Sequence, residues 1–140
     1  MATTTDPALA TAFSALHREL GALYSLIARS FGLTTQQIEL LCQLNGHTPT
    51  FGELATLLGC DKTNVTGMVD RLERRGFLTR QADPADRRVT RAALTPHGIA
   101  LRAEIRAVLE QELAGRLPTA DRTELLALVT AAAAALAETR

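Results

Sequence analysis

Basic side chains gather in one stretch of the chain. Residues 61–91 contain eight arginine or lysine residues and five acidic residues, an excess of three positive charges in a sequence whose formal net charge is zero. Fourteen of the fifteen basic residues of the chain are arginine, whose planar guanidinium donates paired hydrogen bonds to phosphate and to guanine. Because binding follows local charge rather than the total, residues 61–91 are a candidate surface for an anionic partner.

Two short helices joined by a tight turn are predicted to carry part of this stretch. Thr50-Phe51-Gly52-Glu53 has the form of a capping box and begins the first helix, which Gly59 ends. Asp61 caps the second helix, and Gly76 stops it. Its apolar positions follow helical spacing: Val65, Met68, Val69 and Leu72. This arrangement is the helix-turn-helix pattern.

The polar face of the second helix suits the base edges of duplex DNA. Lys62 suits a phosphate or guanine, Asn64 can pair with adenine, and the Thr66 methyl group can meet thymine. Thr50, at the start of the first helix, is a candidate for backbone phosphate. The candidate residues of the second helix are Lys62, Thr63, Asn64, Thr66, Gly67, Arg71 and Arg74. The alternative is an ordinary solvated helix face.

A hairpin with a charged tip follows. Residues 77–80 and 89–94 are predicted strands, and residues 81–88 are a polar turn between them. Arg87 and Arg88 stand at the tip, where a long cation can enter the narrow minor groove. Asp70 is too acidic to face phosphate unaided, so we expect it to hold a hairpin arginine, with Arg88 and Arg91 as candidates. Ordinary solubilising charge is the alternative for this hairpin.

Longer helices are predicted on both sides of this region. Asp6-Pro7 begins a helix that runs to about residue 30, and Thr34-Thr35-Gln36-Gln37 is a capping box for the next. Thr95-Pro96 begins a fifth helix, Pro118 interrupts it, and Thr119 is predicted to cap a sixth. At 140 residues, 46% of them hydrophobic, the chain is expected to form one domain, mainly α-helical with a small β-hairpin.

These pieces, in this order, resemble the MarR family of winged-helix transcriptional regulators. The resemblance covers nearly the whole chain. It rests on Glu53-Leu54-Ala55, residues 65–76, residues 83–88, and Leu94-Thr95 with Gly98. It implies a single domain over 1–140, with a winged helix-turn-helix DNA-binding lobe at 34–95 and dimerisation helices at 6–31 and 96–140.

The resemblance also implies a homodimer that binds an inverted repeat in double-stranded DNA. By the same resemblance, Arg88 enters the minor groove and Asp86 orients the hairpin. The apolar first and last helices agree with self-association, since they offer more hydrophobic surface than a small lobe can cover. Our leading hypothesis is a repressor that a small apolar or aromatic-acid ligand releases from DNA, the ligand lying between the dimer helices and the winged lobe.

Two other hypotheses stay open. One is a winged-helix protein-interaction module that binds no DNA. The other is a thiol-switched repressor acting through Cys60, whose position before a helix favours a lower thiol pKa while Asp61 opposes it. Otherwise Cys42 and Cys60 are expected to be small core residues.

No enzyme, cofactor or metal site is expected. The sequence has no Gly-x-Ser-x-Gly, phosphate-binding-loop or His-Glu-x-x-His motif. His17, His47 and His97 stand on different predicted elements without the spacing of metal ligands. The longest apolar run, residues 131–137, is too short to span a membrane, and the first residues do not resemble a secretory signal. We therefore expect a cytoplasmic protein.

Overall fold

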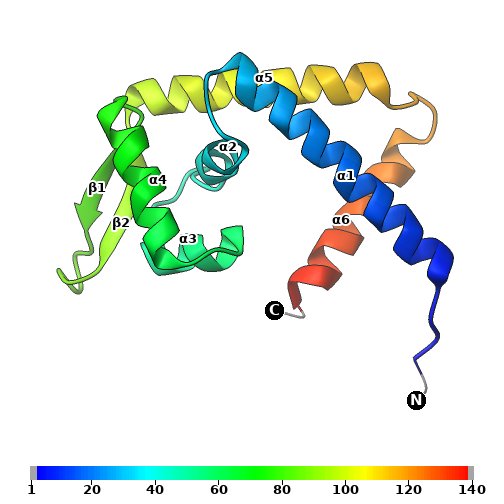
Figure 1. Ribbon diagram of the computed structural model, residues 1–140, viewed down its shortest axis with the longest axis horizontal. Coiled ribbons are helices and arrows are strands. Elements are labelled where there is room, and N and C mark those ends of the chain that lie inside the picture. Colours follow the sequence, from blue (N-terminus) through cyan, green and yellow to red (C-terminus); the bar gives the residue numbers. More distant parts are fainter. Residues whose placement is uncertain (1–2, 139–140) are drawn as a thin grey trace. The chain divides into compact units, whose positions relative to one another are not determined.

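The computed structural model describes residues 3–138 and contains six helices and two strands (Figure 1). The described chain divides into two compact units, residues 3–107 and 108–138. The first unit contains α1 (Pro7–Ser30), α2 (Thr35–Cys42), α3 (Phe51–Leu58), α4 (Lys62–Arg74), β1 (Leu78–Ala82) and β2 (Thr90–Leu94). It also contains the beginning of α5 (Pro96–Arg116), while the end of α5 and α6 (Arg122–Glu138) form the second unit.

Capping side chains begin the helices where the sequence predicts. The Asp6 carboxylate accepts a hydrogen bond from the Leu9 amide at 3.1 Å, and Pro7 occupies the first turn of α1. At α2, Thr34 and Gln37 form the complete capping box. The box predicted at α3 is half formed, because Thr50 accepts from the Glu53 amide while the Glu53 carboxylate lies 3.9 Å from Arg91.

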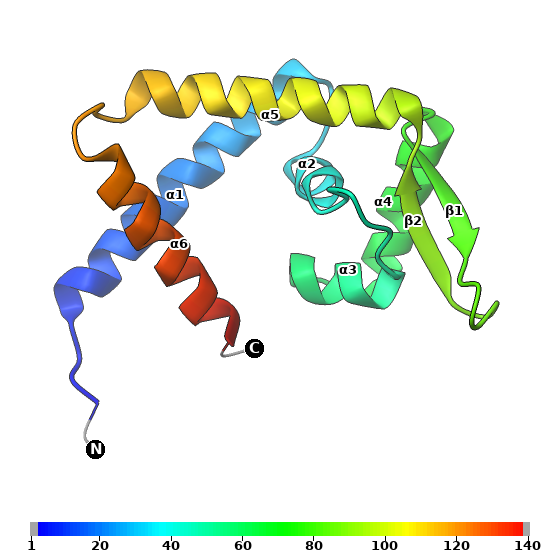
Figure 2. The ribbon, with the colours of Figure 1, turned by 180° about the vertical axis from the view of Figure 1, so that it is seen from behind.

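The interior of the first unit is built from α2, α3 and α4. The most deeply buried side chains include Ile38, Leu41, Leu54, Val65 and Leu72, all fully removed from solvent. Val65, Met68, Val69 and Leu72 are the buried residues of α4, which confirms the predicted apolar face. Figure 2 shows α3 and α4 from the opposite side, next to the hairpin. The core therefore fixes which side of α4 stays in contact with solvent.

The hairpin is displaced from its predicted bounds. β1 and β2 pair antiparallel from Leu78↔Leu94 to Ala82↔Thr90, so Gln81 and Ala82 belong to the first strand. Phe77 and Val89 lie outside the strands. The Asp83 amide donates to the Val89 carbonyl at 2.9 Å and closes the loop. The prediction missed this extension because Gln81 carries no hydrophobic signal, whereas cross-strand hydrogen bonding decides where a strand ends.

The start of α5 is attached tightly to the base of the hairpin. The Thr95 amide donates to the Phe77 carbonyl at 3.0 Å, and the Thr95 hydroxyl donates to the Gly76 carbonyl at 2.6 Å. The Gly98 amide donates back to the Thr95 hydroxyl oxygen. A Cβ atom on Gly98 would collide with the Phe77 carbonyl oxygen. Only glycine therefore permits this close approach of two backbone segments.

The terminal helices keep much of their apolar surface exposed. In α1 the buried residues are Leu23, Ile27 and Ala28, near its carboxyl end, while Leu9 and Phe13 are 54% and 41% exposed. In α6, none of the described residues is buried. Leu126 and Leu128 of this helix are 68% and 62% exposed.

The prediction that Thr119 caps the last helix is wrong. α6 begins at Arg122, after Asp121 adopts a left-handed backbone conformation with φ of 63°. The Arg122 guanidinium donates to the Ala114 carbonyl at 2.8 Å. The turn after Pro118 is therefore held by contacts from Arg122 to the end of α5, which a capping pattern does not reveal. No helix among the described residues is long and apolar enough to cross a membrane.

Candidate nucleic-acid interface

The outer face of α4 carries the polar residues predicted from the sequence. Lys62, Thr63, Asn64, Arg71 and Arg74 are exposed, and Thr66 and Gly67 are partly buried. Asp61 caps the helix by accepting from the Asn64 amide at 2.8 Å. The Thr66 hydroxyl donates to the Lys62 carbonyl at 3.0 Å, so that hydroxyl is engaged within the helix. The amino-terminal end of α4, with its partial positive charge, thus lies beside the Asp61 carboxylate, Lys62 and uncharged polar side chains.

Asp70 binds a hairpin arginine, but not one of those predicted. Its carboxylate forms an ion pair with Arg80 on β1, and Arg80 also lies 3.4 Å from the Glu73 carboxylate. The Arg80 guanidinium stands over the Phe51 ring, 5.6 Å from its centroid. Arg88 and Arg91 instead bind other acids, so both predicted partners of Asp70 are wrong.

Strand alternation explains why Arg80 is the partner of Asp70. Arg80 follows the buried Leu78 by two residues and therefore shares its face of the hairpin. Strand alternation is visible in the sequence, but the prediction named Arg88 at the tip and Arg91 on the second strand and omitted Arg80. The Asp70–Arg80 pair connects the middle of α4 directly to the hairpin.

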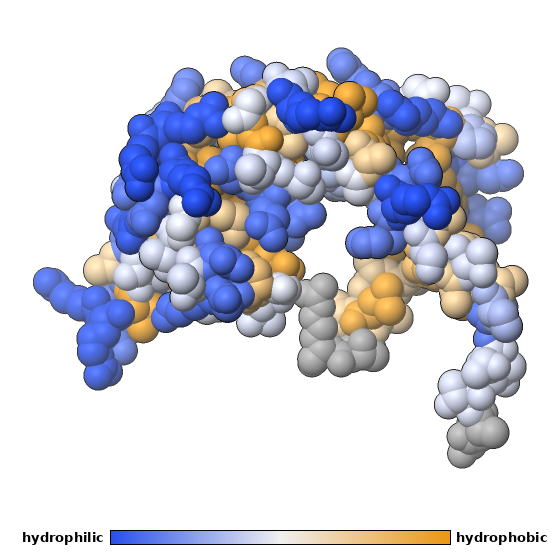
Figure 3. Space-filling view, viewed as in Figure 1, coloured by the Kyte–Doolittle hydropathy of each residue, from blue (hydrophilic) through white to orange (hydrophobic). Residues whose placement is uncertain are grey.

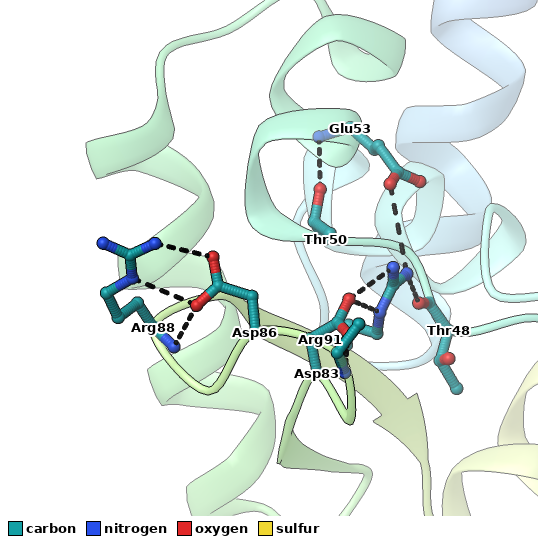
Figure 4. Close-up of polar contacts among 8 residues, drawn as sticks. Thr48, Thr50, Glu53, Asp83, Asp86, Arg88 and Arg91 are labelled. Carbon is teal, nitrogen blue, oxygen red and sulfur yellow. Dashed lines mark hydrogen bonds and ion pairs between the residues drawn. The ribbon is translucent and has the colours of Figure 1, made fainter.

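The hairpin tip presents Arg88 on an ordered loop (Figure 4). The Asp86 carboxylate accepts from the Arg88 amide at 3.1 Å and from its guanidinium at 3.1 and 3.2 Å. These bonds from the side chain and then the backbone of Arg88 hold the pKa of Asp86 below its usual value. Arg88 nevertheless keeps 91% of its side chain exposed, and Arg87 beside it is exposed too. The hairpin tip stands out as a hydrophilic projection in Figure 3.

A second polar cluster lies at the root of the loop and centres on Arg91, which the sequence offered only as a partner of Asp70. Arg91 on β2 contacts the Asp83 carboxylate at 2.8 and 2.9 Å and the Thr48 carbonyl at 2.8 Å (Figure 4). The Ala85 amide, and then Arg91, lower the pKa of Asp83. Thr50 lies beside this cluster, where its backbone forms an isolated bridge with Arg91.

The cysteines are only partly buried, so the expectation that they are core residues is met in part. Burial raises the pKa of the Cys42 thiol, which favours its protonated and less reactive form. Among residues 3–138, no cluster of three histidine, cysteine or acidic side chains is arranged to hold a metal ion.

Comparison with known proteins places this lobe in a family. Residues 33–90 match the model of the MarR family. The uncharacterised HTH-type transcriptional regulator YfiV of Bacillus subtilis is 33% identical over 94 residues, 59% of each chain. The HTH-type transcriptional repressor NicR of Pseudomonas putida is 37% identical over 70 residues, 49% of this chain and 44% of its own. The chain thus spans about half the length of the curated relatives it matches.

The fold extends the likeness over most of the described chain. Wild-type MarR from Escherichia coli has a TM-score of 0.75 at 25% identity, covering 92% of this chain and 98% of its own. BpsR from Bordetella bronchiseptica, whose DNA binding is regulated by 6-hydroxynicotinic acid, has a TM-score of 0.68 at 24% identity over 95% and 98%.

The predicted fold class is therefore confirmed, with six helices and a two-stranded antiparallel sheet in the winged-helix arrangement. MarR-family members are transcriptional regulators rather than enzymes, which agrees with the expectation from the sequence. Family model, relatives and fold converge on one conclusion: the chain carries a MarR-family winged helix-turn-helix at residues 33–90 and shares the fold of MarR-family regulators.

Proposed function

We propose that this protein is a homodimeric, sequence-specific transcriptional regulator that binds an inverted repeat in double-stranded DNA. The observation that carries the proposal is that one compact lobe presents two contact elements together. The polar face of α4 and the hairpin that carries the exposed Arg88 are connected by the Asp70–Arg80 pair. We assign residues 34–95 to DNA binding and residues 6–31 and 96–140 to dimerisation.

The proposed contacts divide into reading and positioning. Asn64 and Thr66 read base edges in the major groove, and Lys62 contacts a phosphate or guanine. Arg88 enters the minor groove beside Arg87, with Asp86 orienting the loop. The remaining contacts to the groove and backbone come from Thr50, Thr63, Gly67, Arg71 and Arg74.

The exposed apolar faces of α1 and α6 support the dimer. Large apolar side chains are exposed on both helices, among them Leu9 and Phe13 on α1 and Leu126 and Leu128 on α6. Apolar surface of this kind, when contiguous, is typical of an interaction site. A second copy of the same chain offers the same apolar surfaces in a two-fold arrangement. Self-association would therefore remove from water the surface that the first unit leaves uncovered on α1 and the second unit on α6.

A cavity in the first unit supports release by a small acid. Its volume is about 430 Å³, and its lining includes Leu44, His47, Ile99 and Arg102. The buried Arg102 Nε atom has no hydrogen-bond partner among the described residues, while another nitrogen of Arg102 donates to the Cys42 carbonyl at 3.3 Å. Apolar side chains beside the cationic Arg102 suit an aromatic carboxylate.

Repression and release are the regulatory mode that the relatives favour. NicR is named as a repressor, and the DNA binding of BpsR is regulated by an aromatic acid. In this protein, a ligand that prefers a conformation with wrongly spaced winged helices would lower DNA affinity. By linkage, DNA would lower affinity for the ligand by the same factor.

Salt dependence of duplex binding, with Arg88→Ala as the variant, tests the proposal. Each neutralised phosphate contributes about −0.9 to the slope of log affinity against log salt concentration. We expect a steep slope for the parent and a shallower one for Arg88→Ala, with the greatest loss on A·T-rich flanks whose minor groove is narrow. Unchanged affinity of Arg88→Ala at several salt concentrations would contradict the assignment of the hairpin.

The two other hypotheses predict different results. A protein-interaction module would show no salt-dependent duplex binding. A thiol-switched repressor would lose DNA binding on peroxide treatment, and Cys60→Ser would protect it. If the parent keeps its affinity in peroxide, the thiol switch is excluded and a bound ligand remains the mode of release.

A further inference from the structure

Arg91 connects three parts of the lobe through one side chain. Its Nε and Nη2 atoms donate to the same Asp83 oxygen at 2.9 and 2.8 Å, and its Nη1 atom donates to the Thr48 carbonyl at 2.8 Å. Nη1 also lies 3.9 Å from the Glu53 carboxylate. Asp83 opens the loop of the hairpin, Thr48 precedes α3, and Glu53 lies in its first turn. Figure 4 shows these groups converging on the guanidinium.

Backbone contacts strengthen the same junction. The Ala92 amide donates to the Pro49 carbonyl at 3.0 Å, and Thr50 and Arg91 form an isolated antiparallel bridge. The other Asp83 oxygen accepts from the Ala85 amide at 2.7 Å. Asp83 is therefore fixed on both sides, by the loop that carries Asp86 and Arg88 and by Arg91.

The geometry requires arginine. A guanidinium presents five donors in a rigid plane, so it can contact a carboxylate along one edge and a carbonyl with another nitrogen. A lysine ammonium keeps the charge but has no fork with which to hold both acceptors in place. The Arg91 side chain is 30% exposed, against 91% for Arg88. Its donors are thus occupied inside the protein, whereas those of Arg88 project from the loop.

We propose that Arg91 is a positioning residue for DNA binding, which sets the hairpin loop relative to the helix-turn-helix without contacting DNA. This inference rests on the proposed function. Asp70–Arg80 connects the strand β1 to α4, while Arg91 fixes the loop itself, and therefore Arg88, to the segment that enters α3. We call the contacts of Arg91 with Asp83 and Thr48 the Arg91 clamp. Without the clamp, the two strands stay paired, but the hairpin tip no longer keeps the distance from α4 that simultaneous contact with the major and minor grooves requires.

Paired variants separate positioning from direct contact because the two roles predict opposite signs for Asp83. If Arg91 contacted a phosphate, Asp83→Asn would remove a competing negative charge and strengthen DNA binding. As a clamp, Asp83→Asn and Arg91→Lys each weaken binding, by about tenfold, which is the scale of a charged hydrogen bond. The double variant should then bind DNA with the same affinity as whichever single variant has the lower affinity, since both changes break the same Asp83–Arg91 interaction.

The effect of Arg88→Ala on DNA affinity, compared between the parent and the Arg91→Lys background, is a measurement that a general loss of stability would not change. In the parent, Arg88→Ala weakens duplex binding, whereas in the Arg91→Lys background the further effect of Arg88→Ala is small. The salt slope of Arg91→Lys alone falls by the Arg88 contribution and no more. Thermal unfolding measured on each variant identifies any loss that comes from unfolding.

Arg75→Lys is the matched control. Arg75 also uses its guanidinium to donate to a distant carbonyl, that of Gly32 at 2.9 Å, but it touches neither the hairpin loop nor the segment before α3. We expect its DNA affinity and its coupling to Arg88 to equal those of the parent.

The outcomes distinguish failure of the proposed DNA binding from failure of the positioning role of Arg91. If the parent protein binds no duplex DNA, the proposed function fails and the clamp with it. If the parent binds and Asp83→Asn tightens binding, or if Arg88→Ala costs the same in the Arg91→Lys background as in the parent, the clamp is wrong while the proposed function stands. Weakening by both single variants, with a non-additive double variant, supports the clamp.

Discussion

The winged-helix lobe at residues 34–95 and the helix α6 use apolar residues in opposite ways. In the lobe, leucine, isoleucine and valine side chains such as Leu54, Val65 and Leu72 are completely buried, and ion pairs such as Asp70–Arg80 and Asp83–Arg91 join the hairpin to its surroundings. In α6, the described leucines and valine remain exposed and none of its residues is buried.

This difference shows that the two regions obtain their stability from different sources. The lobe fulfils its packing and hydrogen-bonding requirements within one chain, as a module that presents a fixed surface must. The helix α6 forms through intrinsic propensity, since alanine and leucine favour helices, but its apolar surface calls for a partner. If that partner is a second copy of the chain, changes in α6 should weaken dimerisation, whereas changes on the surface of the lobe should alter only DNA recognition.

The largest effect is expected from charging the exposed surface of α6. Leu125→Glu combined with Leu128→Glu places four carboxylates on one face of α6 in a two-fold interface and forfeits about 1.5–3 kcal/mol of burial per leucine. Dimerisation should weaken by at least about 1,000-fold. Sedimentation equilibrium at micromolar concentration should then show a monomer, and binding to an inverted repeat should be lost.

Leu57→Glu is the control for this change. Leu57 is 42% exposed on α3, in the lobe rather than in a proposed dimer helix. This variant should remain a dimer. A parent protein that sediments as a monomer and still binds a single half-site tightly would contradict the comparison.

Core truncation should separate the two regions by their dependence on concentration. Leu54→Ala creates a cavity in the lobe and should lower the free energy of unfolding by about 2–5 kcal/mol. Leu126→Ala should act through the dimer, so its effect on the melting temperature should depend on protein concentration more strongly. Calorimetry over a hundredfold range of concentration measures both. Equal, concentration-independent losses would mean that α6 packs within its own chain.

Asn64→Ala and Thr66→Ala probe reading by the lobe. Each should cost about 1–3 kcal/mol on the cognate operator, because each removes a contact to a base edge. Non-specific affinity and thermal stability should be unchanged, since the two side chains lie on the outer face of α4. Titration of cognate and scrambled duplexes gives the ratio of affinities. A uniform loss on both duplexes would assign these residues to the backbone instead.

Lowering the pH should have the smallest effect until the solution is strongly acidic. The pKa values of Asp83 and Asp86 are held below their ordinary value of 3.8, so both carboxylates stay ionised in the folded protein above that pH. Their stabilising contribution is complete above the unfolded pKa and disappears only as the pH falls through the folded values. Loop order, followed by nuclear magnetic resonance, should therefore be constant between about pH 5 and pH 8.

Periodicity and capping chemistry carried most of the fold prediction. The apolar spacing of α4 and the caps Asp6, Thr34 and Asp61 marked features that are local in the chain. The capping pattern predicted the wrong start for α6 at Thr119, because the Arg122 side chain contacts the end of α5 and α6 begins only at Arg122. Local signals fail where a distant contact decides the boundary.

The arginine partners show the same limit at the candidate site. Asp86 and Arg88 are two residues apart and bind each other, whereas the sequence offered Arg88 as a partner of Asp70 and assigned Asp86, by resemblance, only to orienting the hairpin. Asp70–Arg80 and Arg91–Thr48 join elements that meet only after the hairpin has folded onto the helices. Sequence patterns that are local in the chain do not reveal such long-range contacts.

The close approach at Gly98 has a genetic consequence. Every amino acid reached from a glycine codon by one nucleotide change carries a Cβ atom, and that atom has no room beside the Phe77 carbonyl. A selection for loss of regulation should therefore recover changes at Gly98 alongside changes at the DNA surface. Such alleles would be recessive defects of folding. Substitutions at the DNA surface that leave the proposed dimer intact would instead interfere with the parental protein.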